Sequence, residues 1–383
     1  MVHIPAEFDS IRPYTAEELP QVFDRLLANE QFKVVMAHIF PQMKEKELAQ
    51  TLKSCTTNLE VQKKLAYPFL KNLVKQASKG CTIDMQAIDK NKRHTFISNH
   101  RDIVLDSAFL SMLLFDEQCD TTCEIAIGDN LLSLPWVKHL VRVCKAFIVE
   151  RNLPIRQTLI ASKRLSEYIH FVMQHKDDNI WIAQREGRAK DSNDRTQEAL
   201  LKMLTIGGEG DVIDRLKALR IVPLSISYEF DPCDYLKAQE MQQKRDIADF
   251  KKSAEDDVLS MQTGIMGYKG YIHYHCAACI NDFLDTLNRN MPKAELFAAV
   301  AQHIDQEIYR NYRMYPNNYI AADLLAGSTT MNDHYTEQDQ AIFEKYLAGQ
   351  LDKIRVANRD ESFLCDRILE MYANPLKNFL SVR

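Results

Sequence analysis

The sequence predicts an α/β protein with a central, mostly parallel sheet flanked by helices and with helical regions at both ends of the chain. Between about residues 94 and 280, short apolar runs alternate with amphipathic helical patterns, which is the order that strand–helix–strand units produce. On either side of that region, apolar residues recur at helical spacing instead. The chain has 383 residues, 46% of them apolar, and is therefore long enough for one large domain with helical additions.

The first predicted region, residues 1–80, is helical. Thr15 and Glu18 fit a capping box, and the apolar residues that follow lie at i, i+3, i+4 and i+7: Leu19, Val22, Phe23 and Leu26. A second helical pattern covers residues 58–77. Pro68 predicts a kink or break inside it, because proline has no backbone N–H to donate.

The second predicted region, residues 81–280, is the α/β domain. Six apolar runs predict its strands: 94–98, 122–127, 145–149, 180–183, 221–228 and 269–275. Between the third and the fourth run, a helical pattern places four residues on one face: Leu165, Tyr168, Ile169 and Val172. Because parallel strands end at a common edge, we expect the reactive side chains in the loops at that edge.

The third predicted region, residues 281–383, is again helical. Its clearest helix is YTEQDQAIFEKYLAGQL, in which Thr336 is the predicted cap and Gly349 the predicted end. No Gly/Ser linker precedes this region. We therefore expect it to pack on the α/β domain.

Bulk composition excludes several classes of protein. A net charge of −5 does not favour nucleic-acid binding. No apolar run of about 18 residues predicts a transmembrane helix, and the N-terminus lacks the basic flank and apolar block of a secretory signal. The nine cysteines are scattered and odd in number, which favours reduced thiols over disulfides. We therefore expect a cytoplasmic protein.

The stretch FISNHRDIVLDSAFL, residues 96–110, places a histidine and two aspartates where a predicted strand turns into a helix. A carboxylate that holds one ring nitrogen of a histidine makes the other a general base, so His100 with Asp102 or Asp106 is a candidate catalytic pair. The start of a helix also offers N–H groups to an anionic substrate. The structural alternative is a capped helix start, with Asn99 or Asp102 as the cap and His100 merely exposed.

A second candidate feature is the basic stretch 138–164. It holds seven Lys and Arg residues against one acid, Glu150, a difference of +6 in a chain whose net charge is −5: Lys138, Arg142, Lys145, Arg151, Arg156, Lys163 and Arg164. Most of them fit solvated helix charge. Arg151 stands apart because it directly follows a predicted strand, where a guanidinium can bind a phosphate in a bidentate way.

A third candidate feature is IAQREGRAKD, residues 182–191, which follows another predicted strand. Glu186 and Gly187 predict a tight turn, and Arg188 and Lys190 can converge with it on an anion. The fourth stretch, RIVPLSISYE at 220–229, predicts a buried strand that begins near Pro223.

The segment HYHCAAC has the residue types of a zinc site. His273 and His275 alternate within a predicted strand, however, and no second ligand pair lies near Cys276 and Cys279. We therefore predict neither a metal nor a cofactor. A zinc-dependent hydrolase stays as an alternative that bound metal would favour.

Taken in order, these stretches resemble the glycerolipid acyltransferases, most closely the glycerol-3-phosphate acyltransferase branch. The resemblance covers about residues 94–280 and implies the α/β fold of that family. His100-Arg101 and Asp106 match its first block, with five residues between histidine and aspartate where the family has four. The later blocks match at these residues: Gly128, Asn130, Leu131, Pro135, Arg151, Glu186, Gly187, Arg188 and Pro223. The third block here lacks the family's spacer before its arginine.

The resemblance implies a mechanism and a set of site residues. His100 acts as general base on a glycerol hydroxyl that attacks an acyl thioester, and Asp106, favoured over Asp102, holds the imidazole. Backbone N–H groups after His100 stabilise the oxyanion. The implied substrate-binding residues, several of them basic groups for the acceptor's phosphate, are Arg101, Arg151, Glu186, Gly187, Arg188 and Lys190.

The implied substrates are lipid precursors of bacterial-type phospholipid biosynthesis. The donor is acyl-CoA or acyl carrier protein, and the acceptor is glycerol-3-phosphate. Lysophosphatidate or another lyso- or amino-lipid is the alternative acceptor, and a non-catalytic lipid-binding protein of the same fold is a further alternative. Because the product is a lipid, we expect peripheral attachment to the cytoplasmic membrane, with the basic stretch 138–164 as one candidate contact.

Overall fold

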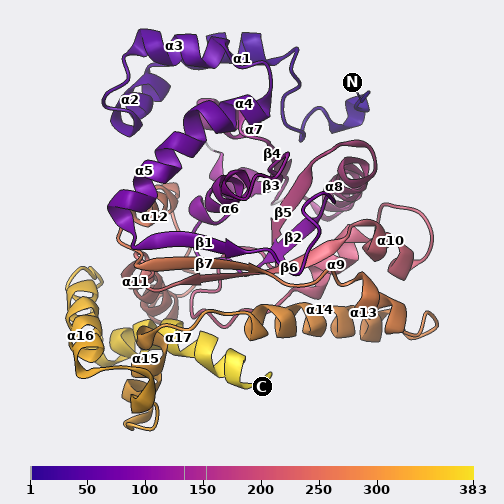
Figure 1. Cartoon of the computed structure of the whole chain (residues 1–383). Coiled ribbons are helices and arrows are strands. Elements are labelled where there is room, and N and C mark those ends of the chain that lie inside the picture. The colour runs from indigo at the N-terminus through magenta and orange to yellow at the C-terminus, as the bar shows by residue number, and fades with distance from the viewer. Residues whose placement is uncertain (1, 133, 152) are drawn as a thin grey trace.

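A seven-stranded sheet forms the centre of the protein (Figure 1). The computed structural model describes residues 2–132, 134–151 and 153–383. The strand order is β1-β7-β6-β2-β5-β3-β4, and neighbouring strands are parallel except for the antiparallel pair β6–β7. The strands are β1 Gly80–Asp84, β2 Thr95–Ser98, β3 Cys123–Gly128, β4 Ala146–Val149, β5 Asn179–Ala183, β6 Ile221–Tyr228 and β7 Tyr271–Cys276. The predicted α/β class with a mostly parallel sheet is confirmed.

All six predicted strands are present within one or two residues of their expected bounds. The strand β1, which pairs with β7 at the edge of the sheet, was not among the predicted strands. None of its five residues is fully buried, and the run GCTID contains a glycine and two polar side chains. An edge strand of this composition lacks the apolar run by which the other strands are predicted.

Both faces of the sheet are covered by helices, as expected for a mostly parallel sheet. Successive strand residues alternate between the two faces, so that Phe96 packs in one cluster and Ile97 in the other. One face is covered by α5 Tyr67–Ala77 and α6 Leu105–Asp116. The other face is covered by α8 Ile155–His175, α9 Glu198–Leu204, α10 Val212–Ala218, α13 Asn281–Thr286 and α14 Lys293–Arg310.

The N-terminal helices form a separate apolar cluster with α7, Pro135–Val143, in which Phe23 and Trp136 take part. They are α1 Leu19–Leu27, α2 Glu30–Ile39, α3 Glu45–Lys53 and α4 Asn58–Val61. A π-helical segment, Gln62–Ala66, joins α4 to α5, and Pro68 lies in the first turn of α5. The predicted break at Pro68 therefore corresponds to a change of helix type within a continuous run.

The C-terminal helices pack on α11, Asp234–Asp246, which follows β6. They are α15 Pro316–Ala326, α16 Glu337–Leu351 and α17 Glu361–Leu380, while α12 Ala254–Met266 lies before β7. The Thr336 cap is confirmed by its hydrogen bond with the Asp339 N–H. The end predicted at Gly349 is wrong: α16 continues to Leu351, because the buried Gln350 amide bonds Asp234 and holds the last turn.

Across the part of the chain that the structure describes, no helix combines the length and the apolar character needed to span a bilayer.

Candidate active site

His100 lies two residues beyond β2, at the edge of the sheet where β2, β3, β4, β5 and β6 end. The turn is anchored by Asn99, whose side chain donates to the Ile226 carbonyl at 2.9 Å and accepts from the Ile226 N–H at 2.8 Å. These two bonds tie the end of β2 to β6. The position of the His100 backbone is therefore fixed by the sheet itself.

Asp106 holds the His100 ring. The His100 Nδ1 lies 2.8 Å from Oδ2 of Asp106, and the Asp106 side chain is fully buried in the first turn of α6. Because a carboxylate only accepts hydrogen bonds, this contact places the ring proton of neutral His100 on Nδ1 and leaves the lone pair on Nε2. The structure thus brings together the histidine and the aspartate that the sequence resemblance paired.

Further donors fix the orientation of the Asp106 carboxylate. The backbone N–H groups of Arg101 and Asp102 donate to Oδ2 at 2.6 and 3.1 Å, and the Tyr228 hydroxyl donates to Oδ1 at 3.2 Å. The two N–H groups that directly follow His100 are therefore engaged by Asp106. This placement does not support the expectation that they bind an oxyanion.

Asp102, the other candidate partner of His100, has a capping role. Its Oδ1 accepts from the N–H groups of Val104 at 2.9 Å and Leu105 at 2.8 Å, at the start of α6. Burial and the nearby Asp106 raise the pKa of Asp102. The sequence left the choice between Asp102 and Asp106 to the resemblance, and in the structure Asp106 contacts the ring.

The Nε2 side of the His100 ring faces away from these anchors. The side chain is 13% exposed, and its ring lies edge-on to Trp181 with ring centroids 5.7 Å apart. The Trp181 indole donates to the Ser98 hydroxyl at 3.1 Å, which fixes this contact. No described residue forms a hydrogen bond with Nε2, so the basic nitrogen is free to receive a proton from a substrate.

Arg151 reaches from the end of β4 across β3 to the end of β5. Its Nη1 lies 3.2 Å from Glu186, three residues past β5, which pairs directly with β2. The crossing is permitted by Gly128 at the end of β3, where any side chain would begin with a Cβ 2.8 Å from the Arg151 Nε. Strand spacing alone would separate β4 from β2 by roughly 14 Å, three intervals of about 4.8 Å. The Arg151 side chain spans two of these three intervals and ends at the strand next to β2.

The turn after β5 matches its prediction. Gly187 has a φ of +67°, a left-handed conformation that favours glycine. The next residue, Arg188, has a buried Nη1 without a hydrogen-bond partner among the described residues, and the side chain lies within electrostatic reach of Asp102 and Asp231. A buried guanidinium nitrogen whose N–H groups have no acceptor is a candidate anion ligand.

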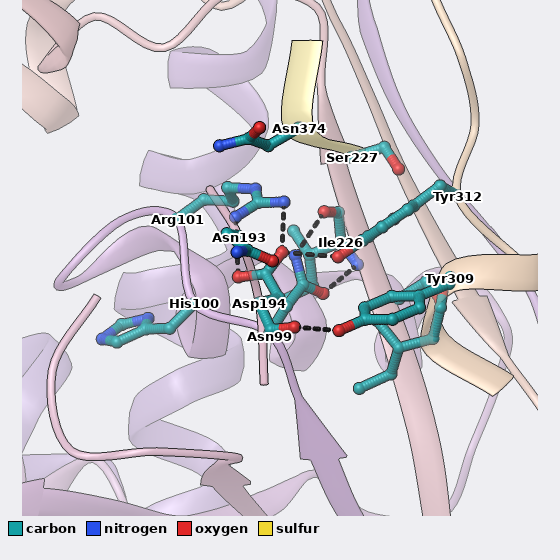
Figure 2. A network of polar contacts seen from close by, with 12 residues as sticks. Asn99, His100, Arg101, Asn193, Asp194, Ile226, Ser227, Tyr309, Tyr312 and Asn374 are labelled. Carbon is teal, nitrogen blue, oxygen red and sulfur yellow. Dashed lines mark hydrogen bonds and ion pairs between the residues drawn. The ribbon is translucent and has the colours of Figure 1, made fainter. Parts of the chain in front are cut away.

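Two residues of the predicted substrate-binding set face elsewhere. The Arg101 guanidinium is buried and forms a bidentate pair with Asp194 at 3.0 and 2.6 Å, beneath the Tyr312 ring. Figure 2 shows the His100 ring pointing away from this pair. Lys190 pairs with Glu240 on α11, and burial lowers its pKa to about 8. Neither placement supports substrate binding, because both cations are already engaged by buried carboxylates.

Sequence reasoning missed several residues that shape the site. Asp194 pairs with Arg101 and accepts a hydrogen bond from the Tyr312 hydroxyl, and the Tyr309 hydroxyl donates to the Asp194 carbonyl (Figure 2). No spacing rule links these residues to His100, because they are 94 to 212 positions away in sequence. Tyr228 could have been found as the polar aromatic residue at the carboxyl end of the buried strand 221–228.

An apolar cavity of about 350 Å³ begins beside the His100 turn. Ile103, Val104 and Leu105, which lead from that turn into α6, form part of its wall. The remaining wall comes from the N-terminal helices, α5, α6, α7, α12 and the strands β3 and β4, with side chains such as Phe40 and Met112. The cavity is therefore an apolar space between the N-terminal helices and the sheet domain.

The histidine and cysteine residues of HYHCAAC lie on and after β7. His273 and His275 have ring centroids 6.4 Å apart, and the Thr82 hydroxyl lies 2.9 Å from His273. Cys276 is buried and lies on the opposite face of the strand. Within residues 2–132, 134–151 and 153–383, the structure contains no group of three or more His, Cys, Asp or Glu side chains arranged to hold a metal ion.

Comparison with known proteins relates the segment that carries His100 to a family of enzymes. Residues 81–224 match the model of a family described as Acyltransferase. The matched segment runs from β1 into β6 and includes His100, Asp106, Arg151 and the turn at 186–188. This part of the chain is similar to that acyltransferase family, and the match does not distinguish one acceptor from another.

None of the curated proteins matches this chain. Among the solved structures, the chain is similar to the crystal structure of the 1-acyl-sn-glycerophosphate (LPA) acyltransferase PlsC from Thermotoga maritima. The two are 11% identical, the TM-score is 0.38, and the similarity covers 76% of this chain and 95% of that one.

Proposed function

We propose that this protein transfers a fatty acyl group from a thioester to a hydroxyl of glycerol-3-phosphate. The observation that carries the proposal is the 2.8 Å contact between His100 and a buried Asp106, inside a segment that matches an acyltransferase family. That contact makes Nε2 of His100 the base. The same chemistry serves lysophosphatidate, which also presents a hydroxyl near a phosphate.

The proposed reaction needs no covalent intermediate on the protein. The acceptor hydroxyl gives its proton to Nε2 of His100 while its oxygen attacks the thioester carbonyl carbon. The buried Asp106 carboxylate stabilises the imidazolium that forms. As the tetrahedral intermediate collapses, the carbon–sulfur bond breaks and the thiolate takes the proton from His100. The ester and the free thiol leave, and the pair returns to its starting protonation state.

Cations at the edge of the sheet would orient the acceptor. Arg151 is partly exposed and its guanidinium lies over the end of β5, beside the strand that carries His100. Arg188 adds a second guanidinium from the same turn, with its buried Nη1 unpaired among the described residues. Binding the phosphate at this turn would hold the neighbouring hydroxyl toward Nε2 and convert a bimolecular encounter into an oriented one.

The apolar cavity would take the acyl chain. It adjoins the segment 103–105 that follows His100, and its wall is almost entirely aliphatic and aromatic. A thioester whose chain occupies this space would present its carbonyl near the turn at residue 100. The donor is acyl-CoA or acyl carrier protein, and the reaction would be carried out at the cytoplasmic face of a membrane in phospholipid synthesis.

An acceptor panel tests the proposal. The purified protein is incubated with acyl-CoA or acyl carrier protein and, in turn, with glycerol-3-phosphate, lysophosphatidate, and glycerol without phosphate. We expect ester formation with glycerol-3-phosphate and none with glycerol. Turnover with lysophosphatidate alone would reassign the acceptor, whereas no turnover with any pair of substrates would contradict enzymatic activity.

A further inference from the structure

The beginning of α8 is an exposed apolar tip at the edge of the sheet that carries His100. Each residue from 155 to 160 is exposed, whereas from Ala161 onward one face of the same helix is buried against the sheet. Ile155, Leu159 and Ile160 are 85%, 65% and 60% exposed. Ile155 has the largest exposed fraction of any large apolar side chain in the described part of the protein. Three aliphatic side chains within six residues are a patch that needs an explanation.

Basic side chains surround these aliphatic ones. From Arg151 to Ser166 the sequence contains four basic residues and no acid, in a chain whose net charge is −5. Arg164 pairs with Glu150, and Arg151 pairs with Glu186. Lys163 is 64% exposed and forms a surface pair with Glu167 at 3.5 Å, whereas Arg156 is exposed and has no ion-pair partner among the described residues. The unpaired charge at the tip is therefore that of Arg156, and the exposed pair between Lys163 and Glu167 is weak enough for Lys163 to exchange its partner.

Helical geometry places both kinds of side chain on one surface. At 100° per residue, Ile155, Leu159 and Lys163 follow each other along the solvent side, and Arg156 and Ile160 lie beside them. The opposite side, with Ala161 and Leu165, packs on the sheet. This arrangement of Ile and Leu with Lys and Arg on one exposed face is typical of helices that lie in the headgroup region of a bilayer.

We propose that the tip of α8, residues 155–163, docks the protein on a lipid bilayer that contains anionic lipids. The aliphatic side chains would enter the headgroup boundary, and Arg156 and Lys163 would bind lipid phosphates. The inference rests on the proposed function, because a lipid-forming enzyme must exchange substrate and product with a bilayer. The tip begins four residues after Arg151, so docking turns the edge that carries His100 toward the lipid.

A bilayer fits this surface better than a folded partner. A projecting tip in which six successive residues are exposed offers a convex surface, whereas protein partners bury complementary patches around a central pocket. Vesicle composition can separate the two contributions to binding, because anionic lipids strengthen the attraction of the cations, whereas the aliphatic groups insert into neutral bilayers as well.

The experiment measures co-sedimentation of the full chain with phosphatidylcholine vesicles, with and without phosphatidylglycerol. We expect the double variant Ile155→Ser with Leu159→Ser to lower the partition coefficient at least about tenfold on vesicles with phosphatidylglycerol, because it removes inserted aliphatic groups. The double variant Arg156→Glu with Lys163→Glu should lower it about tenfold or more on those vesicles and little on phosphatidylcholine alone. Raising the salt concentration should reproduce the second effect in the parent protein.

A matched control comes from α16, on which Ile342 and Lys345 are also exposed. The variant Ile342→Ser with Lys345→Glu should bind vesicles like the parent. Equal binding by the parent and both tip variants would overturn the proposal. So would concentration-dependent self-association of the parent, or binding to acyl carrier protein, that the tip variants lose while vesicle binding stays unchanged.

Acyl transfer in detergent separates this inference from the proposed function. If the tip variants keep their turnover in detergent and bind vesicles as the parent does, only the docking surface is wrong. If the parent protein binds vesicles through the tip but forms no ester with any acceptor, the docking surface stands and the proposed function is wrong.

Discussion

Buried charges gather at both edges of the central sheet, but only one edge leaves a reactive nitrogen free. At the amino edge, Glu124 and Asp178 pair with Lys176 and Lys145, and the Tyr168 hydroxyl donates to Glu124. At the carboxyl edge, Asp106 holds one nitrogen of His100, and the other has no partner among the described residues. We refer to the first set, Glu124, Lys145, Tyr168, Lys176 and Asp178, as the amino-edge cluster.

The size of a cavity does not distinguish the two edges. A hollow of about 760 Å³ adjoins the amino-edge cluster, and it is larger than the apolar cavity beside His100. The ionic side chains of the amino-edge cluster, however, pair with one another. Although burial alone would raise the pKa of Asp178, the charges of Lys145 and Lys176 lower it. A cluster whose charges compensate each other stabilises the fold. A histidine with one ring nitrogen held by a carboxylate and the other without a hydrogen bond can instead act on a substrate.

The largest expected effect comes from removing the free base. His100→Ala should lower kcat for acyl transfer by about 10²–10⁴, because general-base catalysis contributes on that order. The temperature of unfolding should stay near that of the parent, since the ring contributes one hydrogen bond and an edge contact to a partly open site. Activity with acyl-CoA and the preferred acceptor, together with thermal unfolding, measures both quantities. His38→Ala on α2, where His38 is exposed, is the control. Full activity in His100→Ala would remove the distinction between the two edges.

The amino-edge cluster should respond in the opposite way. Asp178→Ala leaves Lys145 buried without its carboxylate, and breaking a buried pair costs about 3–5 kcal/mol of unfolding free energy. We expect unfolding at lower urea concentration and an unchanged kcat per folded molecule. Asp177→Ala is the matched control, because Asp177 is 84% exposed and its pair with Arg93 should contribute at most about 1 kcal/mol. A loss of kcat in Asp178→Ala without loss of stability would argue that the amino edge is also functional.

Local patterns were sufficient to predict most of the fold. The six strands with apolar runs, the long helix α8 and the cap at Thr336 all follow from side-chain periodicity and capping chemistry. The two failures have a common physical cause, since both depend on tertiary contacts. β1 exists because β7 provides a pairing partner, and α16 passes Gly349 because Gln350 bonds Asp234.

The candidate site could be predicted from the sequence only where its contacts join residues that are close together in the chain. His100 and Asp106 lie six positions apart, so a single turn brings them together. By contrast, the carboxylates that pair with Arg101 and Lys190 are Asp194 and Glu240, which lie on other elements, in the first case 93 residues away. A sequence pattern identifies a basic residue near a site, but whether a distant carboxylate has already engaged it is decided by packing.

The carboxyl edge also contains a carboxyl group, Asp234, that has no cationic partner among the described residues, and this group should make stability depend on pH. Burial, with Asp231 nearby, raises the pKa of Asp234 to about 7 from an ordinary value of 3.8. Between about pH 4 and 7, the unfolded chain has lost this proton while the folded protein retains it. The free energy of unfolding should therefore fall as the pH rises through this range and level off above it.

Asp234→Asn isolates that contribution. Each unit of pKa difference corresponds to about 1.4 kcal/mol, so the parent should lose a few kcal/mol relative to the variant between pH 4 and 7. Urea unfolding of both proteins across this range measures the difference, in which other titrating groups cancel. A difference that does not change with pH would show that Asp234 is ionised in the folded protein.

Arg151 should affect substrate binding more than the chemical step. Arg151→Ala removes a guanidinium from the proposed phosphate site, and charge-assisted hydrogen bonds of this kind contribute about 1.5–3 kcal/mol. We therefore expect KM for a phosphorylated acceptor to rise roughly 10- to 100-fold, with a smaller change in kcat. Initial rates across acceptor concentrations separate the two constants. An unchanged KM would contradict the role of Arg151.

The smallest expected effect tests how Arg151 reaches the site. Gly128→Ala leaves every charge in place but puts a methyl group where the Arg151 side chain crosses β3, since the added Cβ would lie 2.8 Å from Nε and 2.5 Å from the Asn130 Oδ1. Both neighbours are flexible side chains, so stability should change little, and Arg151 should be displaced from the end of β5. We expect a rise of a few-fold in KM for the phosphorylated acceptor. In the Arg151→Ala background the same substitution should have no further effect on KM, because no side chain remains to be displaced. Equal effects in both backgrounds would mean that Gly128 acts on the site independently of Arg151.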